Sequence, residues 1–135
     1  METMEMSEQI DKLASALAQA QGELEGVRKT AENPHLRNRY ADLGDVWDAV
    51  RKPLSSHGLS VIQIPLAAQA GFVAVRTLLC HASGQWVGGV ATIPFEPAKG
   101  LNPAQTVGSA LTYLRRYALS AIVGVAPEDD DASTA

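Results

Sequence analysis

Hydrophobic residues recur every three or four positions in three stretches of the chain, a spacing typical of amphipathic helices. The first stretch begins after Ser7, the second spans residues 42–58, and the third spans residues 102–124. Ser7, Asp42 and Asn102 are residue types that cap helix N-termini, and the second and third stretches end at a glycine. Each stretch therefore predicts a helix with one buried face. Pro53 is expected to kink or shorten the second helix.

Three runs rich in Val, Ile and Leu lie between the second and third helices and predict β-strands. They cover residues 59–66, 72–81 and 85–95, and short turns join them. In the middle run, β-branched residues alternate with Arg76, which is therefore expected on the face away from them. Gly88 and Gly89 indicate a bulge or a close backbone approach in the third run. The predicted fold class is α+β, an antiparallel three-stranded β-meander packed on helices.

The last predicted helix separates apolar from polar side chains. Its core face is expected to hold Val107, Ala110, Leu111, Leu114, Ala118, Ala121 and Ile122. The opposite side carries a polar seam made of Gln105, Ser109, Thr112 and Arg116. Arg115 and Gly108 lie on one flank, and Tyr113 and Tyr117 on the other. Amide, hydroxyl and guanidinium groups in a row fit phosphate oxygens or a neighbouring subunit.

Charge is distributed unevenly along the chain, whose net charge is −4. Residues 1–25 carry six acids against Lys12, residues 26–127 carry ten Lys and Arg against five Asp and Glu, and residues 128–135 carry four acids and no base. We therefore expect an acidic N-terminal helical arm at 1–25, a basic core domain at 26–127 and an acidic, disordered tail at 128–135. A basic core domain fits an anionic partner. The alternative is that the acidic ends only keep the protein soluble.

The sequence lacks the residues that several kinds of binding and catalytic site require. The chain has neither a phosphate-binding G-x-x-x-x-G-K-[ST] loop nor a G-x-S-x-G motif, and its three histidines are far apart. Asp42, Asp45 and Asp48 are spaced like a nuclease cluster, but a cap and a solvated face account for them. One cysteine, Cys80, fits a reducing cytoplasm, and no run is long enough to span a membrane. We expect no enzyme, no metal site and no cofactor, with Mg²⁺ at most modulating the activity.

Three blocks of the sequence resemble the Erf (essential recombination function) family of phage single-strand annealing proteins. GSALTYLRRYAL at residues 108–119, with acids at 128–131, resembles the family's signature helix. RYADLGDVWDAVRKPLSSHG at 39–58 and HASGQW at 81–86 resemble its other block and its hairpin turn. Arg37 and Arg39 stand where the family has a lysine pair. The resemblance implies strand annealing, a homo-oligomeric ring or helix, and a β-β-β-α core like that of eukaryotic Rad-type annealing proteins.

Single-stranded DNA is bound by basic grooves that follow the phosphates and by aromatic rings that stack on bases. The candidate DNA-binding residues are Arg37, Arg39, Tyr40, Lys52, Arg76, Lys99, Thr112, Arg115 and Arg116. Tyr40 can equally cover the core. Arg116 is the strongest candidate for a phosphate contact, and its rival role is a contact with a neighbouring subunit. The expected function is ATP-independent annealing of single strands in phage recombination, in the host cytoplasm, with a phage exonuclease or host single-strand-binding protein as further candidate partners. The alternatives are a monomeric OB-like strand-binding protein and an oligomeric adaptor that binds no DNA.

Overall fold

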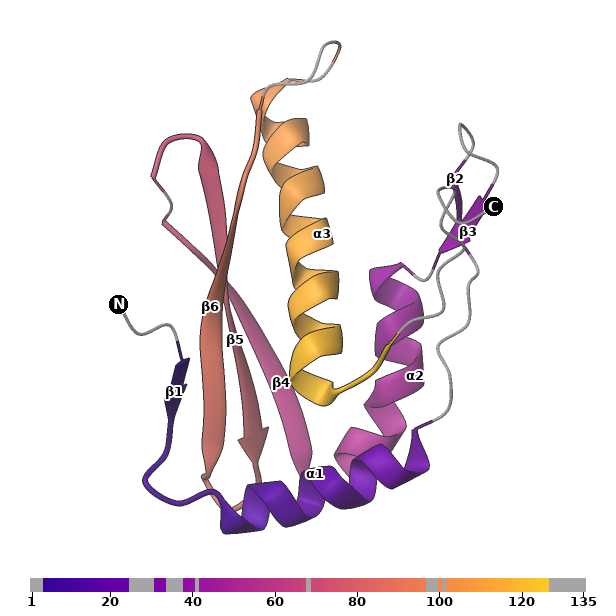
Figure 1. Cartoon of the computed structure of the whole chain (residues 1–135), viewed down its shortest axis with the longest axis vertical. Helices are drawn as coiled ribbons and strands as arrows, with labels where there is room; N and C mark the ends of the chain where they lie inside the picture. The colour runs from indigo at the N-terminus through magenta and orange to yellow at the C-terminus, as the bar shows by residue number, and fades with distance from the viewer. Residues whose placement is uncertain are drawn as a thin grey trace.

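A four-stranded antiparallel sheet and three helices make up the main body of the described chain (Figure 1). The computed structural model describes residues 4–24, 31–33, 38–40, 42–67, 69–96, 100 and 102–126. The helices are α1 (Asp11–Glu23), α2 (Leu43–Ser56) and α3 (Pro103–Val123). The strand order is β1-β6-β5-β4, formed by β1 (Met4–Met6), β4 (Leu59–Leu66), β5 (Phe72–His81) and β6 (Trp86–Pro94). The α+β class and the β4-β5-β6 meander are therefore confirmed.

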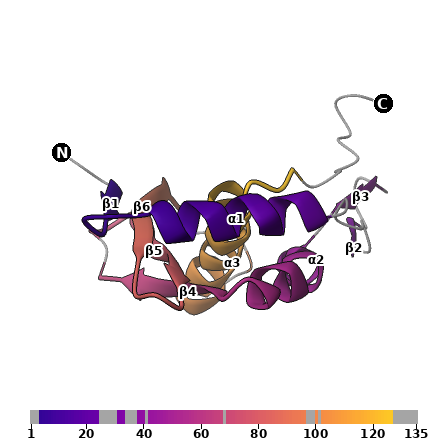
Figure 2. The ribbon, with the colours of Figure 1, turned by 90° about the horizontal axis from the view of Figure 1, so that it is seen from below.

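The helices leave one face of the sheet uncovered. α3 lies along the sheet, α2 lies beside α3 on the side away from the sheet, and α1 crosses the ends of the strands (Figure 1; Figure 2). Val73, Val75, Thr77 and Leu79 of β5 are buried on the face toward α3, as the alternation predicts. Arg76 belongs to the opposite face, which we call the outer face of the sheet. Positions cross-strand from it on that face are Ile64 and Val90.

Gly88 lies at a close approach between β5 and β6. A β-carbon added there would meet the Leu78 side chain and would come within 2.7 Å of the Thr77 carbonyl oxygen. Pairing nevertheless runs residue by residue from Trp86 to Pro94 without a slip. The sequence signal at this position therefore marks a close backbone approach and not a bulge.

α2 begins in a reciprocal cap. The Asp42 carboxylate accepts a hydrogen bond from the Asp45 amide at 2.8 Å, and the Asp45 carboxylate accepts one from the Asp42 amide at 3.0 Å. Asp45 is thus half-buried and occupied in the cap, whereas the sequence places it on a solvated face. The helix also continues past Pro53 to Ser56, so proline does not shorten it as expected. Leu54, which is buried, anchors this last turn.

α1 starts later than the sequence predicts, and Ser7 is not its cap. Ser7 follows β1, and its hydroxyl accepts a hydrogen bond from the Trp86 amide at 3.0 Å because β1 pairs with β6 there. Ile10 occupies the cap position without a side-chain bond, and Gln85 supplies the missing acceptor: its Oε1 binds the Leu13 amide at 3.0 Å. The helix start is therefore satisfied by a residue distant in sequence.

A second, two-stranded hairpin pairs β2 (Ala31–Asn33) with β3 (Asn38–Tyr40). The sequence predicts an irregular segment over residues 33–41, and this expectation is wrong for the residues that the structure describes. Two strands of three residues are too short for apolar alternation to show in the sequence.

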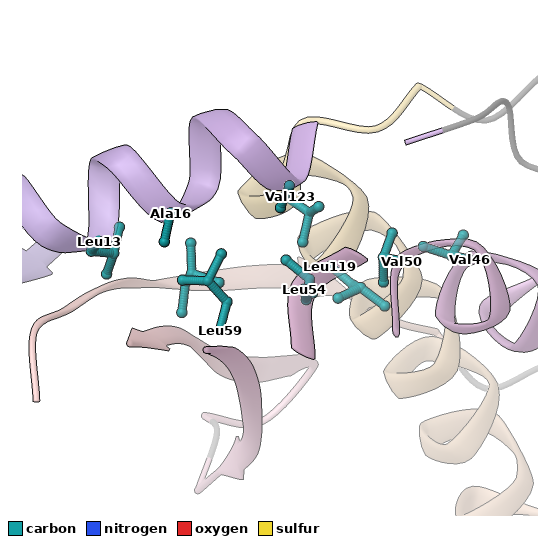
Figure 3. Packing of buried hydrophobic residues seen from close by; sticks show 10 residues of the cluster. Leu13, Ala16, Val46, Val50, Leu54, Leu59, Leu119 and Val123 are labelled. Carbon is teal, nitrogen blue, oxygen red and sulfur yellow. The ribbon is translucent and has the colours of Figure 1, made fainter. Parts of the chain in front are cut away.

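Most of the buried residues form one cluster to which all three helices contribute. Figure 3 shows its side chains converging from α1, α2, β4 and the C-terminal end of α3; the cluster comprises Leu13, Ala16, Ala20, Val46, Val50, Leu54, Leu59, Leu79, Leu119 and Val123. A smaller cluster joins Leu114 of α3 to Val73 and Val75 of β5. The N-terminal arm and acidic tail remain predictions as separate units, although α1 itself contributes three residues to the larger cluster.

α3 changes its buried face along its length. Its first half buries Thr106 and Leu114 toward the sheet, with Val107, Ala110 and Leu111 packed nearby. Its second half also buries Leu119, Ser120 and Val123, because α2 packs against the side away from the sheet and α1 contacts the C-terminal end of α3, where the Gln21 side chain donates to the Val123 carbonyl oxygen. The single apolar stripe expected from the sequence is therefore incomplete, and one of its members, Ala121, is exposed.

Candidate nucleic-acid interface

α3 is the longest of the described helices and carries the row of polar side chains that the sequence predicts as the seam. A reciprocal cap between Asn102 and Gln105 fixes its start, with bonds of 2.8 and 2.9 Å, and Gly124 ends it in the left-handed conformation at φ 87°. The seam residues Gln105, Ser109 and Thr112 are exposed. The Thr112 hydroxyl donates to the Gly108 carbonyl oxygen at 3.0 Å and still has lone pairs toward solvent.

The charge of α3 is entirely positive. Its 21 residues include Arg115 and Arg116 and contain no aspartate or glutamate. By contrast, α1 carries Asp11 and Glu23, and α2 carries both Asp45 and Asp48. An acid-free helix with hydroxyl, amide and guanidinium groups attracts anions such as phosphate.

The paired arginines occupy two different environments. Both side chains are half-buried. Arg116 lies one turn before the buried Ser120, whose hydroxyl donates to the Arg116 carbonyl oxygen at 2.9 Å. Arg116 is therefore in the seam at the point where α3 enters the larger core cluster, and not fully opposite the buried stripe as the sequence indicates.

Arg115 lies on the flank of α3 that faces β4. The Gln63 side chain of β4 donates to the Arg115 carbonyl oxygen at 2.9 Å and to the Thr77 hydroxyl at 3.2 Å. This amide ties the middle of α3 to the sheet, so the rotation of the helix on the sheet is fixed by polar contacts as well as by packing. Gln63 Oε1 is buried and has no hydrogen-bond partner among the described residues.

Two tyrosines project from the other flank of α3. Tyr113 and Tyr117 are 56% and 60% exposed, and their rings stack with centroids 6.4 Å apart and planes 19° apart. The sequence pattern places them on this flank but does not select them as binding residues. Their spacing of four residues beside the seam is the signal that would have found them.

The remaining basic candidates in the described chain are spread over different surfaces. Lys52 is exposed on α2, away from that helix's buried row. Arg51, its neighbour, lies over the Trp47 ring at 5.4 Å from the ring centroid. Arg76 pairs with Glu5 of β1 at 3.3 Å on the outer face of the sheet. Within one chain, Arg76 and the arginines of α3 do not share a face, so one groove cannot hold all of them.

Four candidates lie wholly or partly outside the described residues. Arg37 and Lys99 are outside them, and for Arg39 and Tyr40 the structure describes only the backbone of β3. The acidic tail at 128–135 is also outside. The DNA-binding role of all nine candidates stays a prediction.

Neither a metal cluster nor a membrane-spanning helix is found in the described parts of the chain. No three His, Cys, Asp or Glu side chains there come together in a way that could hold a metal ion. No helix among those residues has the length and apolar character needed to cross a bilayer.

An antiparallel meander followed by a long, acid-free helix defines an α+β domain with a candidate anion-binding surface. The family model of the ERF superfamily matches residues 13–135, and the chain belongs to this family. No curated protein and no solved structure matches the chain. Membership implies single-stranded DNA binding and annealing in phage recombination, and not enzymatic catalysis.

Proposed function

We propose that this protein binds single-stranded DNA without sequence preference and anneals complementary strands without ATP. The observation that carries the proposal is the acid-free polar seam of α3, on a chain of the ERF superfamily. Contacts that such hydroxyl, amide and guanidinium groups make to phosphates carry no sequence information, so a strand held in this way is bound alike whatever its sequence. Bases that are not engaged by base-edge contacts stay available to a complementary strand.

We further propose that the protein acts as a homo-oligomeric ring or helix. On the outer face of the sheet, Ile62 and Ile64 are 46% and 41% exposed, and Leu78 and Val90 are only half-buried. Over the described residues, β4 has a hydrogen-bonded neighbour on one side only. An uncovered apolar sheet face and an unpaired apolar edge strand are both typical of association between chains. These features support self-assembly.

The first test is the salt dependence of DNA affinity. If each subunit neutralises about four to six phosphates, the slope of log affinity against log salt for an oligo-dT strand is about −3 to −4. Fluorescence anisotropy at several salt concentrations measures this slope, with a duplex of equal length as the control. A flat response would contradict binding through phosphates.

Light scattering separates the proposal from its two rivals. A monomeric OB-like protein stays a monomer with and without oligonucleotide, and an adaptor assembles but does not bind the strand. The described sheet is open at both edges, whereas an OB-fold is a partly closed five-stranded barrel. We expect an oligomer that binds the strand and keeps the same number of subunits when it does.

A further inference from the structure

The stacked tyrosines of α3 have no role in the packing of the described chain. Their rings are the most exposed of the large hydrophobic side chains there, at 56% for Tyr113 and 60% for Tyr117. Leu114, Leu119 and Val123 supply the buried contacts of the same helix. Neither tyrosine hydroxyl has a hydrogen bond to a described residue. The fold therefore does not explain two aromatic rings held side by side in water.

The ring geometry suits stacking with a planar partner. The two residues are one helical turn apart, so their rings succeed each other by about 6 Å along the helix axis. The ring planes are within 19° of parallel. Because each ring is more than half exposed, each keeps aromatic surface available to a partner. Two nearly parallel, uncovered rings form a platform for successive flat groups.

The platform runs beside the polar seam. At 100° per residue, Ser109 lies about 40° and Arg116 about 60° around the helix from Tyr113. Arg115 lies about 160° from both tyrosines, on the flank tied to β4 by Gln63. A strand with its phosphates on the seam thus has its bases over the tyrosines, and of the two arginines of α3 Arg116 is the nearer to it around the helix.

We propose that Tyr113 and Tyr117 are a base-stacking site that takes successive bases of a single DNA strand. The inference rests on the proposed DNA binding and names the part of the surface that holds the bases. Charge complementarity selects DNA as the occupant, because Arg116 lies about 60° around the helix from Tyr113 and α3 itself contains no aspartate or glutamate. Stacking tolerates every sequence, since every base has a π-face. The site therefore adds affinity without adding sequence preference.

The test compares two DNA strands and two kinds of variant in the full chain. Tyr113→Ala and Tyr117→Ala should each weaken binding to oligo-dT roughly tenfold, whereas Tyr113→Phe and Tyr117→Phe keep the ring and the affinity. On an abasic strand of equal length, the alanine variants should bind like the wild type. Phe72→Ala is the matched control, because Phe72 is a 46% exposed aromatic residue on β5 and should not matter.

Each other outcome has a distinct meaning. Unchanged affinity for oligo-dT in the alanine variants, or an equal loss on the abasic strand, would refute stacking while leaving DNA binding intact. If the alanine variants form smaller assemblies by light scattering, and lose DNA affinity only to the extent that they lose assembly, the rings contact a second copy of this chain. If the wild type binds neither strand, both the proposed function and this inference are wrong.

Discussion

At the scale of single residues, the two adjacent arginines of α3 are expected to differ in function. Arg116→Ala should weaken binding to single-stranded DNA by about 1.5 kcal/mol, the scale of one charged hydrogen bond. It should also reduce the magnitude of the salt slope by about one unit, because one phosphate contact is lost. Arg115→Ala should instead change packing or assembly, since Arg115 lies on the flank where Gln63 joins α3 to β4. Anisotropy and light scattering on both variants give the comparison.

Arg116→Lys is the control for charge, because lysine keeps the positive charge and loses the planar fork of donors. It should retain the salt slope of the wild type with a smaller loss of affinity. Thermal unfolding of each variant shows whether the half-buried side chain also supports the fold. If Arg116→Ala loses assembly while its affinity per subunit stays intact, the seam is a subunit contact and not a phosphate site.

At the scale of elements, α1 is held to the sheet by a side chain from the turn between β5 and β6. Gln85 Oε1 accepts from the Leu13 amide at 3.0 Å, and Gln85 Nε2 donates to the Asp11 carboxylate at 2.9 Å. Gln85→Ala removes both bonds and should lower the free energy of unfolding by about 1–2 kcal/mol, as loss of a helix cap does. Urea unfolding measures this, with the exposed Gln69→Ala as the control. Equal unfolding midpoints for Gln85→Ala and wild type would contradict it.

The same contact predicts a pH dependence. The hydrogen bond from Gln85 lowers the pKa of Asp11 below its ordinary value of 3.8, because it favours the charged carboxylate. The stabilisation is therefore present above pH 3.8 and is lost as the pH falls through the lower folded value. The stability difference between wild type and Gln85→Ala should shrink well below pH 3.8 and stay constant above it.

Elements with a long, uninterrupted pattern could be predicted from the sequence. The meander and the buried row of α2 follow from residue spacing alone, and the structure confirms them. β1 could not be predicted, because its three residues are ordered by pairing with β6, more than 80 residues later in the chain. The start of α1 was misplaced for a related reason: its cap comes from Gln85 and not from a neighbouring residue.

At the scale of the whole molecule, the sequence predicts the chemistry of the candidate site better than its shape. The seam and the arginine pair could be read from the spacing within α3. The sequence also predicts the face of Arg76, but the side of the sheet on which α3 packs, and so the separation of Arg76 from the seam, follows only from the tertiary structure. The half-burial of Arg116 is a feature of the tertiary structure that no pattern within α3 encodes.

The central claim is that this protein pairs complementary strands without an energy source. The most direct measurement follows the fluorescence of two labelled complementary oligonucleotides, mixed with the full chain in the absence of ATP or any other nucleoside triphosphate. The account predicts that the annealing rate rises well above the spontaneous rate as protein is added, and that it falls again at high salt, where phosphate contacts are screened. Tight binding of each strand with no acceleration of their pairing would contradict the account.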